Sequence, residues 1–396
     1  MENPIAISEN IFWIGANDLE THLFEAIWPL PQGVSYNTYI INDEKVTVID
    51  TLKKSYLPQF IDKIMSIIKN GKSVDYLIVN HMEPDHSGAM KVLHEIFPDM
   101  KIVGNKKTVD YIKGFYGIDE KSIKVVGDGE KLELGKHTLQ FFLTPMVHWP
   151  ETMMTYEVNN KILFSGDAFG GFGTLNGGIF DDEVDLNYFE NEILRYYSNI
   201  VGKYSAMVQK ALAKLKGLDV RIIAATHGPI FRKDPLYIVN LYDRWSRQET
   251  ERGVVIVYAS MYGNTQRMAE SIARALAQEG VDRIRLHNIS KSHVSYVITD
   301  IWRFKGIILG SCTYNTKLFP PIDLLIRTLE NDQLKNRVVG IFGSYSWSGG
   351  AVKELKAFVE KCDVQFVEPA VEVKYSPTQD DYKQLEELGK NIAGAL

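Results

Sequence analysis

The sequence predicts an α/β protein with two domains, and three observations lead to this prediction. The chain has 396 residues, beyond the size at which a single hydrophobic core usually stops growing. Short apolar runs typical of strands alternate with segments whose apolar residues recur every three or four positions, as in amphipathic helices. This alternation becomes strict after residue 253, which indicates a doubly wound parallel sheet in the C-terminal part.

We expect the N-terminal domain to cover residues 1–248. Its apolar runs are bounded by polar residues or glycine, which are the usual limits of strands. The predicted strands lie at residues 37–42, 45–50, 75–80, 139–143, 161–167 and 220–228. Helices are predicted at residues 57–72 and 192–217, where each amphipathic segment is closed by a glycine. This pattern is compatible with an α/β or an α+β arrangement.

The polar and charged stretch at residues 244–253 is the predicted linker, and we expect residues 253–396 to form the second domain. The predicted strands of this domain lie at residues 254–260, 284–290, 305–311, 337–344 and 369–375. Its predicted helices lie at residues 264–280, 321–332, 351–362 and 379–396. Strand and helix follow each other in turn, as they do in a parallel sheet covered by helices on both faces.

Composition excludes several classes of protein. The net charge of −6 offers no basic surface for nucleic acid, so no nucleic-acid partner is expected. The start of the chain lacks an export signal, and no run approaches the roughly 18 to 20 apolar residues that span a membrane. Cys312 and Cys362 are too few for a disulfide framework or a four-cysteine iron site. We therefore expect a cytoplasmic protein whose metals are bound by nitrogen and oxygen.

Four histidines and three carboxylates follow the ends of predicted strands. They are His81, Glu83, Asp85 and His86 after the strand at 75–80, His148 after that at 139–143, Asp167 at the end of 161–167, and His227 in 220–228. Because strand ends meet at one edge of a sheet, these side chains are expected to lie close together. Burying the dense loop at 81–86 without a cation would be costly, because its charges would lose their hydration. The sequence therefore predicts a metal site.

The ligand types favour a pair of iron or manganese ions over a closed structural zinc site, which takes four ligands and prefers thiolates. Three carboxylates and one bridging hydroxide would neutralise two divalent ions. Asp167 comes from a separate strand and is the candidate bridge. If the loop backbone is extended, His81, Glu83 and Asp85 face one side and His86 faces the other, so one loop can serve both ions.

The loop between the strand at 254–260 and the helix that begins near Thr265 predicts a phosphate site. Free backbone N–H groups at a helix start attract an anion. The chain has neither a Walker lysine after this loop nor a GxGxxG motif, which favours a mononucleotide. Two further strand ends add aromatic rings and hydroxyl groups to the pocket. The residues expected to form it are Ser260, Met261, Tyr262, Gly263, Asn264, Thr265, Ser311, Cys312, Thr313, Tyr314, Asn315, Ser344, Tyr345, Trp347, Gly349 and Gly350.

The motif HxExDH at residues 81–86, together with His148, Asp167 and His227, resembles the metal-binding pattern of the flavodiiron proteins. Hydrolases of the metallo-β-lactamase fold carry HxHxDH instead. The three C-terminal loops resemble the FMN-binding loops of flavodoxin. The resemblance covers essentially the whole chain. It implies an N-terminal metallo-β-lactamase-like αββα sandwich and a C-terminal flavodoxin-like doubly wound parallel sheet.

The resemblance also implies a role for each site residue. His81, Glu83 and His148 would hold one iron, Asp85, His86 and His227 would hold the other, and Asp167 would bridge them. In this family the histidine at the position of His86 can swing away from the metal. FMN would supply the electrons. Tyr196 or Tyr197, and His22, are candidates for protonating or orienting oxygen species.

The implied reaction is the reduction of dioxygen to water, of nitric oxide to nitrous oxide, or of both. The implied assembly is a head-to-tail homodimer or a dimer of dimers, fed by a separate donor such as rubredoxin or a reduced deazaflavin. The residues alone leave two alternatives open. One is a hydrolase with a regulatory flavodoxin-like domain. The other is an electron carrier like flavodoxin, but this alternative leaves the seven metal ligands unexplained. Glu83 favours redox chemistry, because a carboxylate in place of an imidazole stabilises the ferric state.

Overall fold

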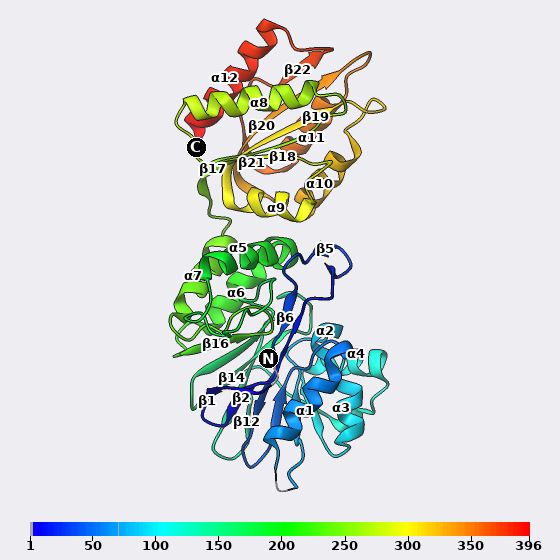
Figure 1. Cartoon of the computed structure of the whole chain (residues 1–396), viewed down its shortest axis with the longest axis vertical. Helices are drawn as coiled ribbons and strands as arrows, with labels where there is room; N and C mark the ends of the chain where they lie inside the picture. The colour runs from blue at the N-terminus through cyan, green and yellow to red at the C-terminus, as the bar shows by residue number, and fades with distance from the viewer. Residues whose placement is uncertain (1–2, 70) are drawn as a thin grey trace. The chain divides into compact units, whose positions relative to one another are not determined.

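The computed structural model describes residues 3–69 and 71–396, and the chain forms two compact units, Met1–Ser246 and Arg247–Leu396 (Figure 1). The segment predicted as a linker at 244–253 is mostly regular structure. Helix α7 (Pro235–Ser246) extends into it, because the apolar Trp245 near its end is buried, and strand β17 (Glu251–Ala259) begins inside it. The polar composition of this segment therefore overstated the length of the linker.

Two β-sheets form the centre of the N-terminal unit. The first has seven strands in the order β1 (Ile5–Ser8), β2 (Ile11–Trp13), β7 (Tyr39–Ile41), β8 (Thr47–Ile49), β9 (Tyr76–Ile78), β10 (Lys101–Gly104) and β11 (Ile123–Val125). The second has five, in the order β12 (Lys131–Glu133), β13 (Thr138–Leu143), β14 (Met153–Glu157), β15 (Ile162–Gly166) and β16 (Ile222–Ala225). Two small sheets pair β3 (Ala16–Asp18) with β6 (Val34–Tyr36), and β4 (Leu23–Phe24) with β5 (Trp28–Pro29).

The two large sheets face each other across a buried core. The ring of Tyr39 packs on Phe164 with centroids 5.0 Å apart, and its hydroxyl donates to the carbonyl oxygen of Ala225. One group of helices, α1 (Leu57–Ile67), α3 (Met90–Ile96) and α4 (Lys106–Tyr116), lies on one side of this unit. The helices α5 (Leu186–Tyr196), α6 (Ser205–Leu215) and α7 lie on the other side (Figure 1). This order of layers confirms the predicted αββα sandwich.

The segment predicted as one helix at 192–217 is interrupted. Helix α5 ends at Tyr196, a π-helical turn covers Tyr197–Val201, a short 3-10 turn covers Gly202–Tyr204, and α6 follows. Apolar residues continue through the break, so the spacing of apolar residues gave no sign of it. A π turn inserts an extra residue into the helical period and is frequent at functional sites. Here it directly follows Tyr196, whose side chain reaches the candidate metal centre.

The C-terminal unit has one parallel sheet, with strands in the order β18 (Ile284–Asn288), β17, β19 (Phe304–Cys312), β20 (Lys335–Tyr345) and β21 (Asp363–Phe366), and with β22 (Val371–Lys374) also paired to β20. Helices α9 (Val294–Arg303), α10 (Pro320–Asn331) and α11 (Ala351–Lys361) bury their apolar residues against one face. Helices α8 (Asn264–Gln278) and α12 (Gln379–Ala395) cover the other face. The predicted doubly wound parallel sheet is therefore confirmed.

In the C-terminal unit, the sequence prediction missed α9 and β21. Helix α9 is rich in β-branched and aromatic residues, which have low helix propensity, and includes Val297, Ile298 and Trp302. Burial of these side chains against the sheet outweighs the propensity. Within residues 3–69 and 71–396, no helix is both long and apolar enough to cross a bilayer.

Candidate metal centre and nucleotide pocket

The seven predicted metal ligands come together beside the carboxyl ends of strands in the N-terminal unit. Their side chains form two clusters, and the possible ligand atoms within each cluster lie within 4.8 Å of one another. One cluster contains His81, Glu83, His148 and Asp167, and the other contains Asp85, His86 and His227. The assumption of an extended loop at 81–86 was wrong. Pro84–Ser87 forms a helical turn, α2, which moves Asp85 away from Glu83 and places it beside His86.

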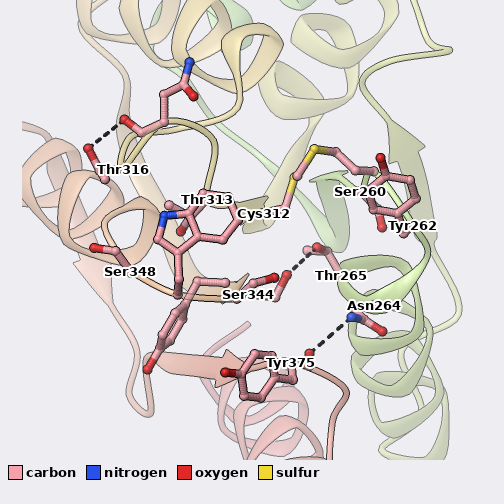
Figure 2. Close-up of a pocket in the computed structure, with 15 residues that line it drawn as sticks. Ser260, Tyr262, Asn264, Thr265, Cys312, Thr313, Thr316, Ser344, Ser348 and Tyr375 are labelled. Atoms are coloured by element: carbon pink, nitrogen blue, oxygen red, sulfur yellow. Dashed lines mark hydrogen bonds between the residues drawn. The ribbon is translucent and has the colours of Figure 1, made fainter.

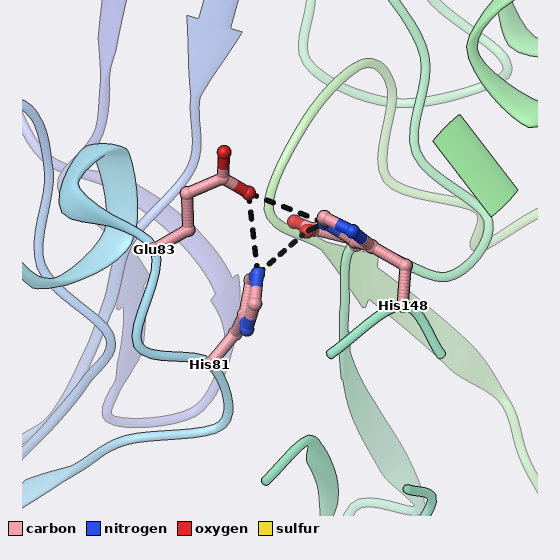
Figure 3. Close-up of side chains that lie close together, drawn as sticks. His81, Glu83 and His148 are labelled. Atoms are coloured by element: carbon pink, nitrogen blue, oxygen red, sulfur yellow. Dashed lines mark hydrogen bonds and ion pairs between the residues drawn. The ribbon is translucent and has the colours of Figure 1, made fainter. Parts of the chain in front are cut away.

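The first cluster presents two imidazole nitrogens and two carboxylate oxygens. Oε2 of Glu83 lies 3.3 Å from Nε2 of His81 and 3.2 Å from Nε2 of His148 (Figure 3). Oδ2 of Asp167 lies 3.4 Å and 3.0 Å from the same two nitrogens. All four residues are buried, and Glu83 is the most accessible at 8% exposure. These imidazole nitrogens and carboxylate oxygens converge on one point, as the ligands of a metal ion do.

Asp167 also reaches the second cluster, with its other oxygen. Oδ1 of Asp167 lies 2.9 Å from Nε2 of His86 and 3.7 Å from Nε2 of His227. Oδ2 of Asp85 lies 3.4 Å from each of these nitrogens. One oxygen of Asp167 therefore faces each cluster, as in a carboxylate that bridges two ions. His86 points into its cluster and not away from it.

Several atoms of the second cluster are left unsatisfied. Both carboxylate oxygens of Asp85 and the Nε2 atoms of His86 and His227 are buried, and among the described residues they make no hydrogen bond of acceptable geometry, although the two nitrogens lie within ion-pair distance of Asp85 and of Asp167. Buried polar atoms are otherwise almost always paired, because an unpaired one loses its hydration without compensation. A cation at this point would satisfy all three side chains. The residues present therefore fit a second metal ion.

Neighbouring groups fix the orientation of two ligand imidazoles. Oε1 of Glu151 lies 2.8 Å from Nδ1 of His81 and also accepts a hydrogen bond from the backbone N–H of Met82. Nδ1 of His227 lies 2.6 Å from the carbonyl oxygen of Ser35. When Nδ1 donates to an oxygen, Nε2 keeps its lone pair for a metal. Sequence reasoning missed these partners. Glu151 follows His148 by three residues, which is a usable signal, whereas a backbone acceptor such as Ser35 leaves none.

Glu151→Gln is expected to weaken metal binding by about 10- to 100-fold, the usual cost of losing such a supporting carboxylate. The amide can accept the hydrogen bonds but carries no negative charge to increase the basicity of His81. Competition with a chelator for Zn²⁺ measures the affinity. Unchanged affinity in this variant would show that Glu151 does not support the ligand.

The two clusters perturb each other's protonation. Burial opposes charge on the imidazoles, but nearby carboxylates, with Asp167 acting on all three, raise the pKa of His81 to about 9 and the pKa of His86 and His148 to about 10. Burial also opposes charge on the carboxylates, yet the imidazoles hold the pKa of Asp167 and Glu83 well below the usual range. Without a metal, the cluster is therefore a set of ion pairs.

Metal binding is expected to strengthen as pH rises from 6.5 to about 9. A metal binds only the neutral imidazole, so bound protons must leave His81, His86 and His148, and each such proton adds about a tenfold rise in affinity per pH unit. Raised pKa values also stabilise the metal-free fold below pH 6.5, and this stabilisation is lost as pH rises through 9 to 10. Zn²⁺ affinity and proton release at several pH values measure the effect, and a constant affinity contradicts it.

Of the predicted proton donors, the structure brings only Tyr196 to the metal centre. Its ring is fully buried, 5.6 Å from the ring of His227, and its hydroxyl has no hydrogen-bond partner in the described part of the chain. Burial, with the carboxylates of Asp167 and Glu83, raises the pKa of Tyr196 well above its usual value. Tyr197 instead shares a hydrogen bond with Ser205.

His22 is exposed and does not line the cavity at the metal centre. This cavity is bordered by Glu83 and Asp85. A carboxylate that sequence reasoning missed, Glu25, also borders it. Burial and the charge of Glu83 raise the pKa of Glu25 to about 7.

A second cavity lies at the carboxyl ends of β17, β19 and β20 in the C-terminal unit (Figure 2). The predicted residues that line it are Ser260, Met261, Tyr262, Asn264, Thr265, Cys312, Thr313, Asn315, Ser344, Tyr345 and Trp347. Thr316, Ser346, Ser348 and Tyr375 line it as well and were not predicted. The predicted residues Gly263, Ser311, Tyr314, Gly349 and Gly350 are not among the lining residues.

The polar end of this cavity is the start of helix α8. Gly263 precedes the helix with a φ of +90°, a conformation that favours glycine, and its N–H donates to the hydroxyl of Ser260. The hydroxyls of Thr265 and Ser344 lie 3.0 Å apart, and the amide of Asn264 donates to the carbonyl oxygen of Tyr375 (Figure 2). Free N–H groups and hydroxyls at a helix start suit a phosphate. Ser311 is buried instead and accepts a hydrogen bond from the backbone of Phe319.

Comparisons with known proteins agree with both sites. A family model described as ODP family beta lactamase matches residues 34–228, and a flavodoxin model matches residues 256–389. The nitric oxide reductase of Moorella thermoacetica is 33% identical over 400 residues, with both chains covered in full. The anaerobic nitric oxide reductase flavorubredoxin of Escherichia coli K12 is 33% identical over 394 residues, which are 98% of this chain and 82% of the relative.

Solved structures are similar over the same length. The rubredoxin oxygen:oxidoreductase of Desulfovibrio gigas has 31% identity and a TM-score of 0.94, with 99% of this chain and 98% of that chain covered. The flavodiiron protein of Giardia intestinalis has 28% identity and a TM-score of 0.93, with 99% and 96% covered. The similarity to the reductases extends over both units. The chain therefore belongs to the flavodiiron protein family.

Proposed function

We propose that this protein holds two iron ions and one FMN per chain and reduces dioxygen to water, nitric oxide to nitrous oxide, or both. The observation that carries the proposal is the position of Asp167, which turns one oxygen toward each of two clusters of histidine and carboxylate. The names of the similar proteins, nitric oxide reductase and rubredoxin oxygen:oxidoreductase, support both substrates. In this proposal, residues 1–248 form the domain that holds the irons and residues 253–396 form the domain that holds FMN.

The metal ligands are assigned from the two clusters. His81, Glu83 and His148 would hold one ion, and Asp167 would bridge it to the other. Asp85, His86 and His227 would complete the second site. When bound, the irons supply the redox chemistry and FMN supplies the electrons. Three carboxylates offset most of the charge of the metal pair, and Glu83 adds a hard oxygen donor that favours iron over a softer ion.

The residues around the metals control protons and access. Tyr196 keeps its proton because its hydroxyl is buried beside carboxylates. That hydroxyl is free to donate a hydrogen bond to a small molecule in the centre, because no described residue accepts it. The buried walls of the centre exclude bulk water and strengthen each such interaction.

FMN is assigned to the cavity of the C-terminal unit. Its phosphate would lie against the start of α8, where the hydroxyls of Ser260 and Thr265 and the backbone N–H groups converge. Trp347 and Tyr345 would border the flavin ring, because aromatic side chains stack well on flat conjugated rings. The Walker lysine that a triphosphate site needs is absent from this loop.

Thr265→Val is expected to weaken FMN binding by roughly 10- to 150-fold. Removing one hydrogen bond to a charged group costs about 1.5–3 kcal/mol, and each 1.4 kcal/mol is about a tenfold change in Kd. Quenching of FMN fluorescence by the flavin-free protein measures the Kd. Thr328→Val, at a half-buried position of α10 outside the cavity lining, is the matched control and should leave the Kd unchanged.

We infer that the electron donor is either a rubredoxin or a reduced deazaflavin. Rubredoxin is named in the D. gigas and E. coli relatives. At the rim of the flavin cavity, Tyr262 is 93% exposed and Trp347 is 81% exposed, and such aromatic surface is typical of a docking site. We infer a head-to-tail homodimer, or a dimer of dimers, as the working assembly, and light scattering tests it. The two free cysteines suit the reducing cytoplasm that we infer as its location.

Elemental analysis and flavin release from the purified protein test the cofactor assignment. The proposal predicts two irons and one FMN per chain. A protein that instead holds zinc and hydrolyses a thioester or phosphodiester would contradict it and would be a hydrolase of the same fold.

A further inference from the structure

The hydroxyl group of Thr226 contacts the carboxylate that is assigned as the bridge. Oγ1 of Thr226 lies 2.6 Å from Oδ1 of Asp167, and both residues are buried. An ionised carboxylate can only accept hydrogen bonds, so the hydroxyl is the donor. Hydrogen bonds of this length to a charged oxygen are about twice as strong as those between neutral groups. The accepting oxygen is the one that faces the second cluster, 2.9 Å from Nε2 of His86.

The fold places Thr226 at the position next to Asp167. Strands β15 and β16 are parallel neighbours, and Gly166 at the end of β15 pairs with Ala225 at the end of β16. Asp167 and Thr226 each follow directly after one of these strand ends. The backbone N–H of Thr226 donates to the carbonyl oxygen of Gly166, at 3.0 Å. The two side chains therefore start from adjacent points of the same sheet edge.

The segment that leads into β7 fixes the backbone of Thr226 from a second direction. The backbone N–H of Asn37 donates to the carbonyl oxygen of Thr226, at 2.6 Å. The side-chain amide of Asn37 donates to the carbonyl oxygens of Ala225 and Gly228, at 3.0 and 2.8 Å. The indole N–H of Trp13 donates to Oδ1 of Asn37, at 2.9 Å, and so holds this amide in place. Threonine is branched at Cβ and has few favoured rotamers, so a fixed backbone also restricts its hydroxyl.

A carboxylate serves two ions only when it is turned so that one oxygen points at each of them. The torsion that turns the carboxyl group of an aspartate has broad, weakly defined minima. In Asp167 the hydrogen bond from Thr226 keeps Oδ1 on the side of the second cluster. Oδ2 is thereby left on the side of the first cluster, 3.0 Å from Nε2 of His148.

We propose that Thr226 is a positioning residue for the metal pair, because its hydroxyl holds the carboxylate of Asp167 in the orientation that serves both ions. The inference rests on the metal pair of the proposed function. Residues that support a metal ligand usually contribute about 10- to 100-fold to metal affinity. Glu151 supports His81 in the first cluster alone, whereas Asp167 faces both clusters. Loss of the Thr226 hydroxyl is therefore expected to weaken the binding of both ions.

Titration of the metal-free protein with Co²⁺ alone tests this assignment. Thr226→Val keeps the shape of the side chain and removes the hydroxyl, so we expect both Co²⁺ ions to bind about 10- to 100-fold more weakly. We also expect a changed visible absorption spectrum, because the orientation of a shared ligand changes. Thr38→Val is the matched control and should bind Co²⁺ as the parent protein does. Thr38 is buried in the same unit, and its hydroxyl has no hydrogen-bond partner among the described residues.

A second pair of variants separates the effect of the hydroxyl from that of packing. Thr226→Ser and Thr226→Ala both lack the methyl group, and they differ only in the hydroxyl. We expect Thr226→Ser to bind both Co²⁺ ions at least about tenfold more tightly than Thr226→Ala. Thermal unfolding of the metal-free variants establishes that each is folded.

Two results would overturn the inference. One is a Thr226→Val protein that binds both ions as tightly as the parent, and the other is equal affinity in Thr226→Ser and Thr226→Ala. A parent protein that binds fewer than two Co²⁺ ions would instead contradict the metal pair of the proposed function, so the two failures are distinct. Neither gas nor reductant is present, so the readout does not depend on activity.

Discussion

Replacing Asp167 with alanine is expected to release both metal ions and to lower gas reduction by more than about 100-fold, the upper limit for loss of a merely supporting group. Asp167 presents one oxygen to each cluster, at 3.0 Å from Nε2 of His148 and 2.9 Å from Nε2 of His86. Its loss also removes a negative charge that acts on three buried imidazoles, so cations in the centre lose part of their neutralisation.

Metal content per chain and rates of gas consumption measure this effect. The flavin should be retained, because Asp167 lies in the other structural unit. Asp219→Asn, an exposed carboxylate paired with Lys161 in the same unit as Asp167, is the matched control and should keep both metals. If Asp167→Ala keeps two irons per chain and normal turnover, Asp167 does not bridge the metal ions.

Glu83→His is expected to lower iron retention and gas reduction while leaving FMN in place. The variant carries the HxHxDH motif of the hydrolases and loses one negative charge at the first ion. Oε2 of Glu83 sits between the nitrogens of His81 and His148, so an imidazole at this position would give that ion three nitrogens. Nitrogen donors suit zinc, and a neutral ligand stabilises the ferric state less than a carboxylate does.

Iron and zinc analysis after growth with both metals, followed by reductase assays, measures this change. We expect the ratio of iron to zinc to fall relative to the parent. If Glu83→His keeps full reductase activity and its iron, the carboxylate of Glu83 is not what favours iron and redox chemistry at this site.

The fold and most of the metal centre follow from local features of the sequence. Strand ends are marked by apolar runs followed by polar residues, and His81, Asp167 and His227 each stand at such an end. In the structure Asp167 and His227 follow the parallel strands β15 and β16 of one sheet, and His81 follows β9 of the other sheet, so strand ends of both sheets contribute to the centre. The order of strand and helix in the C-terminal unit is equally local. It therefore predicted the doubly wound sheet, even though α9 went unrecognised.

Features that depend on distant packing were not predictable. His22 was a candidate from the family resemblance, but in the structure His22 is exposed and does not line the cavity, whereas Glu25 of the same segment does. Nothing in the local sequence marks the positive φ values of Glu25 and Ala26, which packing of Phe24 and Arg195 holds in place. Tyr375 borders the flavin cavity because β22 pairs with β20, a contact between segments that lie apart in the chain.

The most direct test of the central claim is the reaction of the fully loaded and reduced protein with each gas. The protein with two irons and one FMN per chain is reduced without oxygen, and dioxygen or nitric oxide is then added in parallel while consumption is recorded. We predict rapid consumption of at least one gas, with water or nitrous oxide as product, and no such consumption by Asp167→Ala. Failure of the loaded parent protein to consume either gas would contradict the account.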